Sequence, residues 1–219
     1  MKKIAMGFAL LAPFALAQAQ SNVTLYGVMD ASVSFGNNGG GGKTTRLDSG
    51  VGPGSRLGFR GNEDLGGGLR AVFTAEMGID SGTGGFQQGN LPFGRQIFVG
   101  LGSGNTWSLT LGRQYSPTEL AVTAADALGQ NYWNSTAGYG IGTLMSPIGN
   151  GVIGSGCQGA TVRVNNSVLG SYSASGFTGK LMVGMGDESQ AGSGRLINPS
   201  VQYTNGALML TAAYSQMRQ

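Results

Sequence analysis

The chain has 219 residues, of which 42 are glycine and only 11% are charged, and it contains one cysteine and no histidine. The absence of histidine removes the usual general base of hydrolytic triads and the commonest metal ligand, so an enzyme, a metal site or another cofactor is not expected. The formal net charge of +3 includes no run of basic residues, which argues against a nucleic-acid partner.

The first segment, MKKIAMGFALLAPFALAQAQ, carries two lysines ahead of a short apolar run and has small residues at Ala17 and Ala19. This pattern is typical of a secretory signal peptide, and the apolar run is shorter than the roughly 20 residues that a membrane-spanning helix needs. We predict a signal peptide over residues 1–19 and a single β-barrel domain over residues 20–219. Without the two lysines, eleven basic residues remain against ten acidic ones, so the mature protein is close to neutral.

The next segment, SNVTLYGVMDASVSF, alternates apolar and polar residues, which indicates a strand with one face toward each environment. A polar, glycine-rich loop is expected over residues 36–54. The segment SRLGFRGNEDLGGGLRAVFTAEMGID then predicts two strands joined by a tight turn. One face of this pair carries Arg56, Arg60, Arg70 and Glu76, and the other face is apolar.

Further strands are predicted in RQIFVGL, TWSLTLGRQY, ATVRVNNSVLGSYS, GKLMVGMGD, RLINPSVQYTN and ALMLTAAYSQM, which brings the total to nine. The connections alternate between long and short, and one long irregular segment spans residues 116–159. Long external loops and short periplasmic turns alternate in this way in outer-membrane barrels. No amphipathic helix of convincing length is apparent.

Alternating strands with a charged face make physical sense in a lipid bilayer. Backbone polar groups cannot stay unpaired in hydrocarbon, so strands persist there only in a closed barrel. The apolar face then meets lipid, and the charged face lines a water-filled lumen. We therefore predict an all-β fold, an antiparallel transmembrane β-barrel of which this chain supplies about nine strands, so that the barrel is incomplete.

The segments SNVTLYGVMDASV, SRLGFRGNEDLGGGLRAVFTAE, FGRQIFVGL and WSLTLGRQYSP closely resemble the trimeric general porins of β-proteobacteria. The resemblance implies 16 antiparallel strands, a homotrimer in the outer membrane, and a third external loop folded into the barrel as a constriction. Residues 116–159 stand where that loop belongs. The chain looks like the first 60% of such a porin, and it ends in AYSQMRQ where family members end in an aromatic residue.

The resemblance also implies a constriction, or eyelet, with a basic cluster on the wall opposite acidic groups on or near the loop. Three arginines match or resemble the family's wall positions: Arg56, Arg95 and Arg163. Arg113 resembles an eyelet arginine of related enterobacterial porins, although strict alternation would place it on the face of Leu109 and Leu111. The candidate acidic residues are Glu76, Glu119 and Asp126.

Charges of opposite sign across a narrow aqueous neck act strongly on passing ions, and four arginines against three acids favour anions modestly. The resemblance therefore implies a general diffusion porin that passes ions and small hydrophilic solutes with weak anion selectivity. A structural or adhesive surface protein with a plugged or inactive barrel is the alternative. Four aromatic residues invite a sugar-binding interpretation, but we expect them to pack the loop against the wall or to belong to an interfacial girdle: Tyr115, Tyr132, Trp133 and Tyr139.

Overall fold

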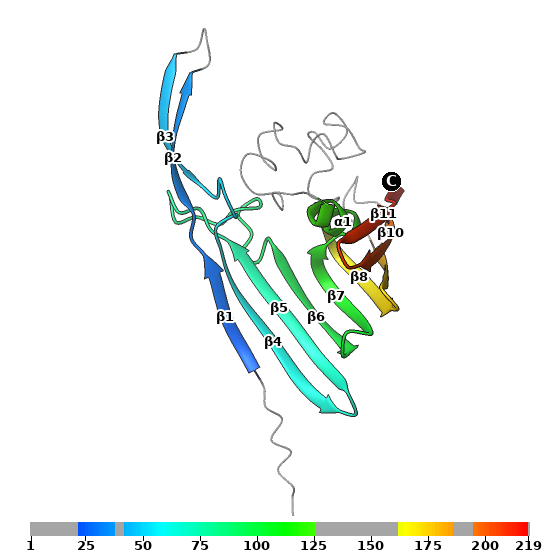
Figure 1. The fold of residues 1–219 in the computed structure, drawn as a ribbon. Coiled ribbons are helices and arrows are strands. Elements are labelled where there is room, and N and C mark those ends of the chain that lie inside the picture. The colour runs from blue at the N-terminus through cyan, green and yellow to red at the C-terminus, as the bar shows by residue number, and fades with distance from the viewer. Residues whose placement is uncertain (1–21, 38–41, 126–161, 186–194, 219) are drawn as a thin grey trace, which may run out of the picture.

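The computed structural model describes residues 22–37, 42–125, 162–185 and 195–218, and within these ranges most of the chain is β-structure (Figure 1). The described ranges hold one complete helix, α1 (Pro117–Ala125). The strands are β1 (Asn22–Val28), β2 (Ala31–Asn37), β3 (Lys43–Ser49), β4 (Arg56–Gly66), β5 (Leu69–Gly78), β6 (Gln96–Ser103), β7 (Trp107–Tyr115), β8 (Arg163–Ala174), β9 (Phe177–Gly184), β10 (Arg195–Asn205), β11 (Leu208–Ala213) and β12 (Gln216–Arg218).

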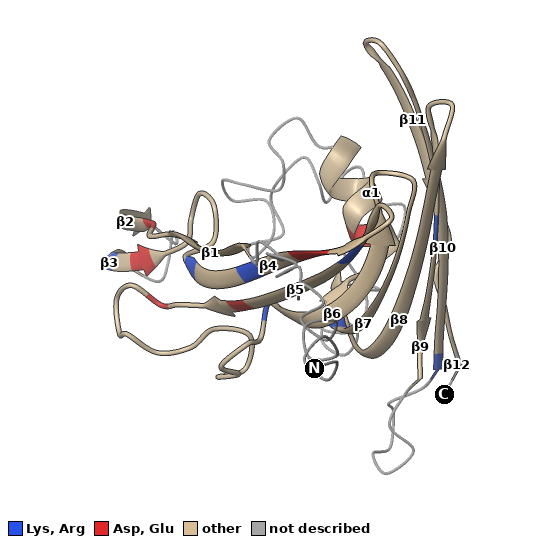
Figure 2. Ribbon diagram, turned by 90° about the horizontal axis from the view of Figure 1, so that it is seen from below, with Lys and Arg blue, Asp and Glu red and all other residues tan. Residues whose placement is uncertain are grey.

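One large antiparallel sheet forms the body of the protein. Its strands follow the order β1-β4-β5-β6-β7-β8-β9-β10-β11, and the short β12 continues β11 along β10. Seen from below, these strands trace an open, curved wall (Figure 2). The nine-strand path corresponds to the nine strands predicted from the sequence. The all-β antiparallel prediction is therefore confirmed, and the described strands form an incomplete barrel.

The short connections between neighbouring strands are tight glycine turns. Two glycines join β4 to β5, and Gly67 has a φ of 62°, in the left-handed region that glycine adopts without steric cost. Ser175 and Gly176 join β8 to β9 with φ values of 52° and 82°, as expected for a two-residue hairpin turn with two positive φ angles. The β4–β5 and β6–β7 turns lie at the same lower end of the wall in Figure 1, which confirms the predicted alternation there.

The predicted first strand is broken at Asp30, and this corrects the loop expected over residues 36–54. Its second half, β2, leaves the sheet and pairs with β3 in a separate hairpin that projects beyond the rim (Figure 1). The backbone at Asp30 is bonded differently from a strand: its carbonyl accepts from Gly50 N at 3.1 Å and from Ser55 Oγ at 2.9 Å. Ser55 is fully buried at this junction, which is where the chain turns away from β4.

The outer face of the wall is apolar and exposed. Leu25 on β1 and Val99 on β6 expose 62% and 61% of their surfaces, and Leu181 on β9 exposes 51%. Large apolar side chains exposed along neighbouring strands are the expected surface of a barrel that meets lipid. Among the described residues, α1 is too short to serve as a membrane-crossing helix.

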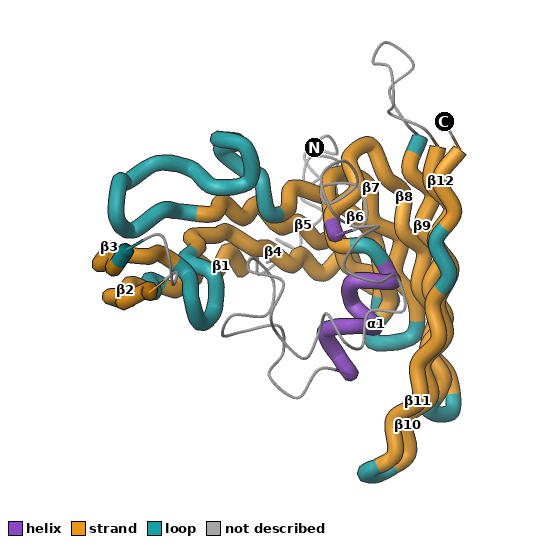
Figure 3. Tube along the Cα trace, turned by 90° about the horizontal axis from the view of Figure 1, so that it is seen from above, coloured by secondary structure: helices purple, strands orange, loops and turns teal. Residues whose placement is uncertain are grey.

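The inner side carries α1, which lies within the curve of the wall (Figure 3) and contacts β9, β10 and β11. Ser116 Oγ accepts a hydrogen bond from Glu119 N at 3.1 Å, and Pro117 occupies the first helical position. A serine cap followed by proline is a strong helix start. The segment expected to be irregular from residue 116 therefore begins with a helix, and residues 126–159 of the predicted loop lie outside the described residues.

Candidate functional site: a row of arginines on the inner wall

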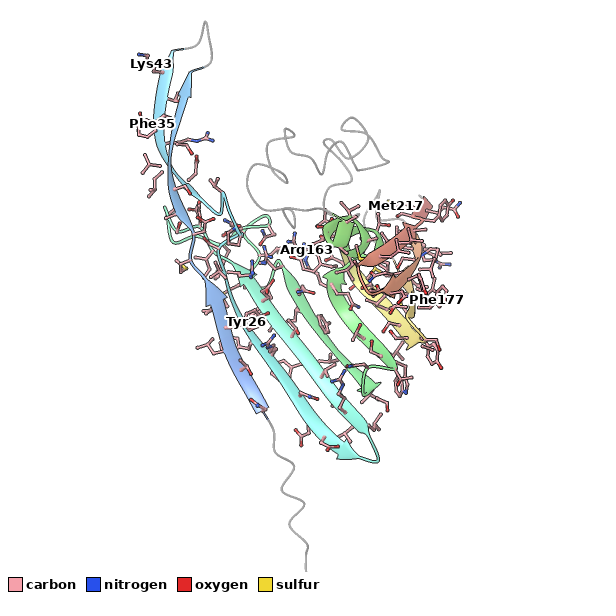
Figure 4. All side chains as sticks on the ribbon, viewed as in Figure 1. Tyr26, Phe35, Lys43, Arg163, Phe177 and Met217 are labelled. Atoms are coloured by element: carbon pink, nitrogen blue, oxygen red, sulfur yellow. The ribbon has the colours of Figure 1, made fainter. Side chains whose placement is uncertain are left out.

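Side chains from four strands, together with Arg95 just before a fifth, form a continuous row of hydrogen bonds across the inner wall. The row runs from Tyr26 on β1 through Glu76, Arg95 and Tyr115 to Arg163 on β8. Figure 4 labels Tyr26 and Arg163, the two ends of this row, which lie on different parts of the curved wall. We call these five residues, together with Arg56, the arginine row.

Glu76 on β5 is the carboxylate of the arginine row and exposes only 5% of its surface. Its Oε1 lies 2.6 Å from Arg95 Nε, and its Oε2 accepts a hydrogen bond from the Tyr26 hydroxyl at 2.9 Å. Arg56 Nε is 3.9 Å from Oε2, at the outer limit of an ion pair. The 2.6 Å bond between Glu76 and Arg95 is charged, short and buried, so it fixes Arg95 in one orientation.

Tyr115 joins the remaining two arginines. Its hydroxyl oxygen accepts from Nη2 of Arg95 and from Nη2 of Arg163, each at 2.8 Å. The Arg163 guanidinium also lies over the Tyr115 ring, with its central carbon 4.6 Å from the ring centroid. The two like charges are thus held near each other by a neutral acceptor and an aromatic face. Tyr115 is the last residue of β7, so it is part of the wall itself.

The strand register explains why these side chains meet. Glu76 pairs with Gln96 in the β5–β6 ladder. Arg95 directly precedes Gln96, so its side chain begins close to Glu76. Across the β7–β8 interface Tyr115 pairs with Arg163. These positions are distant in sequence, and only the antiparallel ladders bring them to one level.

A glycine on β4 makes room for the first hydrogen bond of the row. Gly58 pairs with both Tyr26 and Glu76, which stand on the two flanking strands. A Cβ atom at Gly58 would lie 2.5 Å from Tyr26 Cζ, so the tyrosine ring covers the glycine and reaches over it to the carboxylate. Arg60, two residues further along β4, lies over the same ring, 5.3 Å from its centroid.

Arg113 takes different partners. Its Nε donates to the Gly94 carbonyl at 2.8 Å, and its guanidinium also bonds the Asn165 side chain. The β7–β8 register shifts between Gly112 and Gln114, and Gly112 has a φ of 138°. Such a bulge interrupts strict alternation, so the side of Arg113 cannot be read from the positions of Leu109 and Leu111.

Two of the three candidate acids lie in the described residues, and they stand on different elements, β5 and α1. Glu76 lies within the arginine row, whereas facing rows of opposite charge would place it across the lumen. Glu119 stands in the first turn of α1. Asp126 lies outside the described residues, as do Tyr132, Trp133, Tyr139, Cys157 and the predicted signal peptide. The described residues include no group of three or more His, Cys, Asp or Glu side chains placed to hold a metal ion.

Asn198 on β10, which the sequence did not single out, fastens the helix to the wall. It is fully buried; its Oδ1 accepts from Thr118 N at 3.0 Å, and its Nδ2 donates to Thr118 Oγ1 at 2.6 Å and to the Tyr214 carbonyl. Beside it lies a small apolar core of Val164, Met182 and Leu196. The sequence carried no sign of this role, because polar residues are ordinary on the inner face and the contact with α1 joins residues 80 positions apart.

Comparison with known proteins places this geometry in a family. The family model described as Gram-negative porin matches residues 5–219. Outer membrane porin protein 32 of Delftia acidovorans is 36% identical over 236 residues, covering 100% of this chain and 60% of the relative. An outer membrane porin protein of Bordetella pertussis is 33% identical over 245 residues, covering 99% of this chain and 60% of that protein.

A solved structure agrees with these relatives. The anion-selective porin from Comamonas acidovorans superimposes with a TM-score of 0.73 at 29% identity, covering 90% of this chain and 57% of that protein. The chain thus spans about 60% of the length of the relatives it matches. The family match across residues 5–219 shows that this chain belongs to the Gram-negative porins and is an outer-membrane β-barrel protein, as its sequence predicted.

Proposed function

We propose that the protein is a general diffusion porin that passes ions and small hydrophilic solutes and prefers anions. The observation that supports this most strongly is the composition of the arginine row, which holds three arginines, Arg56, Arg95 and Arg163, and one carboxylate, that of Glu76. The formal charge of these four side chains is +2, on a wall whose outer face is apolar. A positive inner wall attracts anions and repels cations along the whole width of the neck.

Further features of the proposal come from the family resemblance. The complete protein has 16 strands, forms a homotrimer in outer-membrane lipid, and is exported after removal of residues 1–19. The segment 116–159 acts as the constriction loop, and α1 is its anchored start. Arg113 and Glu119 belong to the same eyelet, Asp126 completes its acidic side, and Glu76 balances the basic wall.

The barrel alone does not settle whether the lumen conducts, since the structural or adhesive alternative would use the same fold. The family consists of channels rather than enzymes. We propose no catalytic role for this chain and no cofactor. The arrangement of the arginine row favours conduction, because a plugged barrel gains nothing from three cations held along one inner wall.

The test is the ion selectivity of the purified protein in planar bilayers. The reversal potential in a KCl gradient should indicate preference for chloride in the wild type. The double variant Arg56→Glu with Arg163→Glu should move that potential towards cation selectivity. Lys43→Glu on the projecting hairpin is a matched charge reversal away from the arginine row and should leave the potential almost unchanged. Channels without anion preference, or a potential insensitive to the double variant, would contradict the proposal.

A further inference from the structure

The projecting hairpin of β2 and β3 has an apolar face that no described part of the protein covers. Val33 on β2 pairs with Leu47 on β3, and these two side chains expose 59% and 57% of their surfaces. Phe35, two residues beyond Val33, exposes 79%. An isolated two-stranded hairpin is marginally stable in water, and large apolar side chains exposed side by side mark an interaction surface.

The opposite face of the hairpin is polar. Ser34 pairs with Arg46 in the β2–β3 ladder, and Arg46 Nε lies 2.8 Å from Asp48 Oδ1. Thr44 covers Gly36 on this face, since a Cβ atom at Gly36 would lie 2.7 Å from Thr44 Oγ1. The hairpin is therefore amphipathic, which is the property of elements that lie at the boundary between water and lipid.

The apolar face of the hairpin continues the lipid-facing surface of the wall. Leu25 on β1, Met29 at the break, and Val33 and Phe35 on β2 follow one two-residue period, and all four side chains are exposed. β1 has seven residues, so it is about 23 Å long. A tilted strand needs about 9–11 residues to cross a bilayer. The upper boundary of the hydrocarbon layer should therefore lie beyond the end of β1, at the foot of the hairpin.

The hairpin also lies away from the barrel interior. In Figures 2 and 3, β2 and β3 lie outside the curve of the wall, on the far side of β1 from α1. Figure 4 shows Phe35 on the side of the hairpin that is turned away from the wall. The apolar face is thus directed toward the surroundings of the barrel, which for an outer-membrane protein are lipid at this level.

We propose that the hairpin binds the lipid surface around the barrel at its external rim. Its apolar face rests at the boundary of the hydrocarbon layer, and Lys43, at the upper end of the hairpin in Figure 4, meets anionic headgroups. The break at Asp30 releases the hairpin from the main sheet, so it can follow the membrane surface while β1 keeps its pairing with β4. This inference does not depend on the ion selectivity of the channel.

The test places one nitroxide label on the hairpin of the whole protein, reconstituted in vesicles of phosphatidylcholine and phosphatidylglycerol. Cys157 is the only cysteine, so Cys157→Ser gives a background in which Phe35→Cys introduces a single site. Electron paramagnetic resonance compares collisions of the label with oxygen, which concentrates in lipid, and with a water-soluble nickel chelate. Thr44→Cys on the polar face is the matched control, and Leu25→Cys on the outer face of the wall is the lipid reference.

At position 35 we expect oxygen collisions to predominate, as at position 25, and at position 44 we expect collisions with the nickel chelate to predominate. Predominance of nickel collisions at position 35 overturns the inference, because the apolar face would then stand in water. A label at position 35 shielded from both reagents, with disulfide-linked dimers of Phe35→Cys, also overturns it, because a second copy of the chain would then cover the face. The reversal potential that tests the proposed function is a separate measurement, so either proposal can fail alone.

Discussion

Arg95 and Glu76 contact each other through both backbone and side chain. The Arg95 amide donates to the Glu76 carbonyl at 3.2 Å, and the Arg95 Nε lies 2.6 Å from Glu76 Oε1. The pair therefore belongs to the sheet through its backbone atoms and to the inner wall through its side chains. A carboxylate in this position serves two purposes, since it fixes one arginine of the row and lowers the positive charge of the wall by one.

Glu76→Gln should separate these two purposes. The amide keeps the shape and one acceptor oxygen but removes the charge, so we expect the anion-to-cation permeability ratio to rise about two- to fivefold. Arg95 loses its ion pair while mostly buried, which should lower the free energy of unfolding by about 1–3 kcal/mol. Reversal potentials and urea midpoints measure the two effects. A fall in anion preference would show that Glu76 matters mainly by holding Arg95 in place.

Gly58→Val should displace the Tyr26 ring. The new Cβ would overlap Tyr26 Cζ, so the ring must rotate away and its hydrogen bond to Glu76 is lost. We expect destabilisation of about 1–3 kcal/mol, typical of overpacking, seen as a lower melting temperature. Gly179→Val on β9 is the matched control, because a Cβ there meets nothing within 4 Å. Equal effects of the two substitutions would contradict the predicted role of Gly58.

Asn198→Ala should loosen α1 from the wall. The substitution leaves the Thr118 amide and the Tyr214 carbonyl without their buried partner, at a cost of about 2–4 kcal/mol. Because the helix begins the proposed constriction loop, single-channel currents should become noisier while the mean conductance changes little. Asn205→Ala, at the exposed end of the same strand, provides the comparison. Quiet currents in Asn198→Ala would mean that the apolar contacts alone hold the helix.

The projecting hairpin should respond to acid. Hydrogen bonds from Ser34 and Arg46 hold the pKa of the Asp48 carboxyl below its usual value. A depressed pKa means that the carboxylate stabilises the hairpin at neutral pH and that this contribution is lost as the pH falls through the lowered pKa. Ser34→Ala should raise the pKa of Asp48, followed by NMR titration of the carboxyl carbon. An unchanged titration midpoint would contradict the assignment of Ser34 as the main cause.

Much of the wall follows from the two-residue period of its strands. The apolar residues of SRLGFRG and RAVFTAE, apart from Val72, fall on one face, and the charged residues fall on the other, so the sequence is sufficient to assign an inside and an outside. The nine strands of the main sheet were predictable for the same reason. The predicted inner positions of Arg56 and Glu76 agree with their contact in the structure.

Other features depend on contacts between distant residues and could not be predicted from a period. At the break, the hydroxyl of Ser55, 25 residues further along the chain, bonds to both the amide and the carbonyl of Asp30, as a neighbouring strand otherwise would. The short capped helix begins in a segment whose prolines and glycines suggest irregular chain. The meeting of Glu76 with three other side chains depends on strand register, which a single sequence does not specify.

The break at Asp30 also divides the protein into parts that can change independently. Below it, every residue of β1 is matched to a partner on β4, and a one-residue insertion would turn the whole lipid-facing surface inward. Above it, β2 and β3 pair only with each other, and the junction at Ser55 restores the register of β4 whatever the length of the hairpin. The hairpin of β2 and β3 is therefore a place where inserted peptides or a diversified exposed surface should leave the pairing of β1 with β4 unchanged.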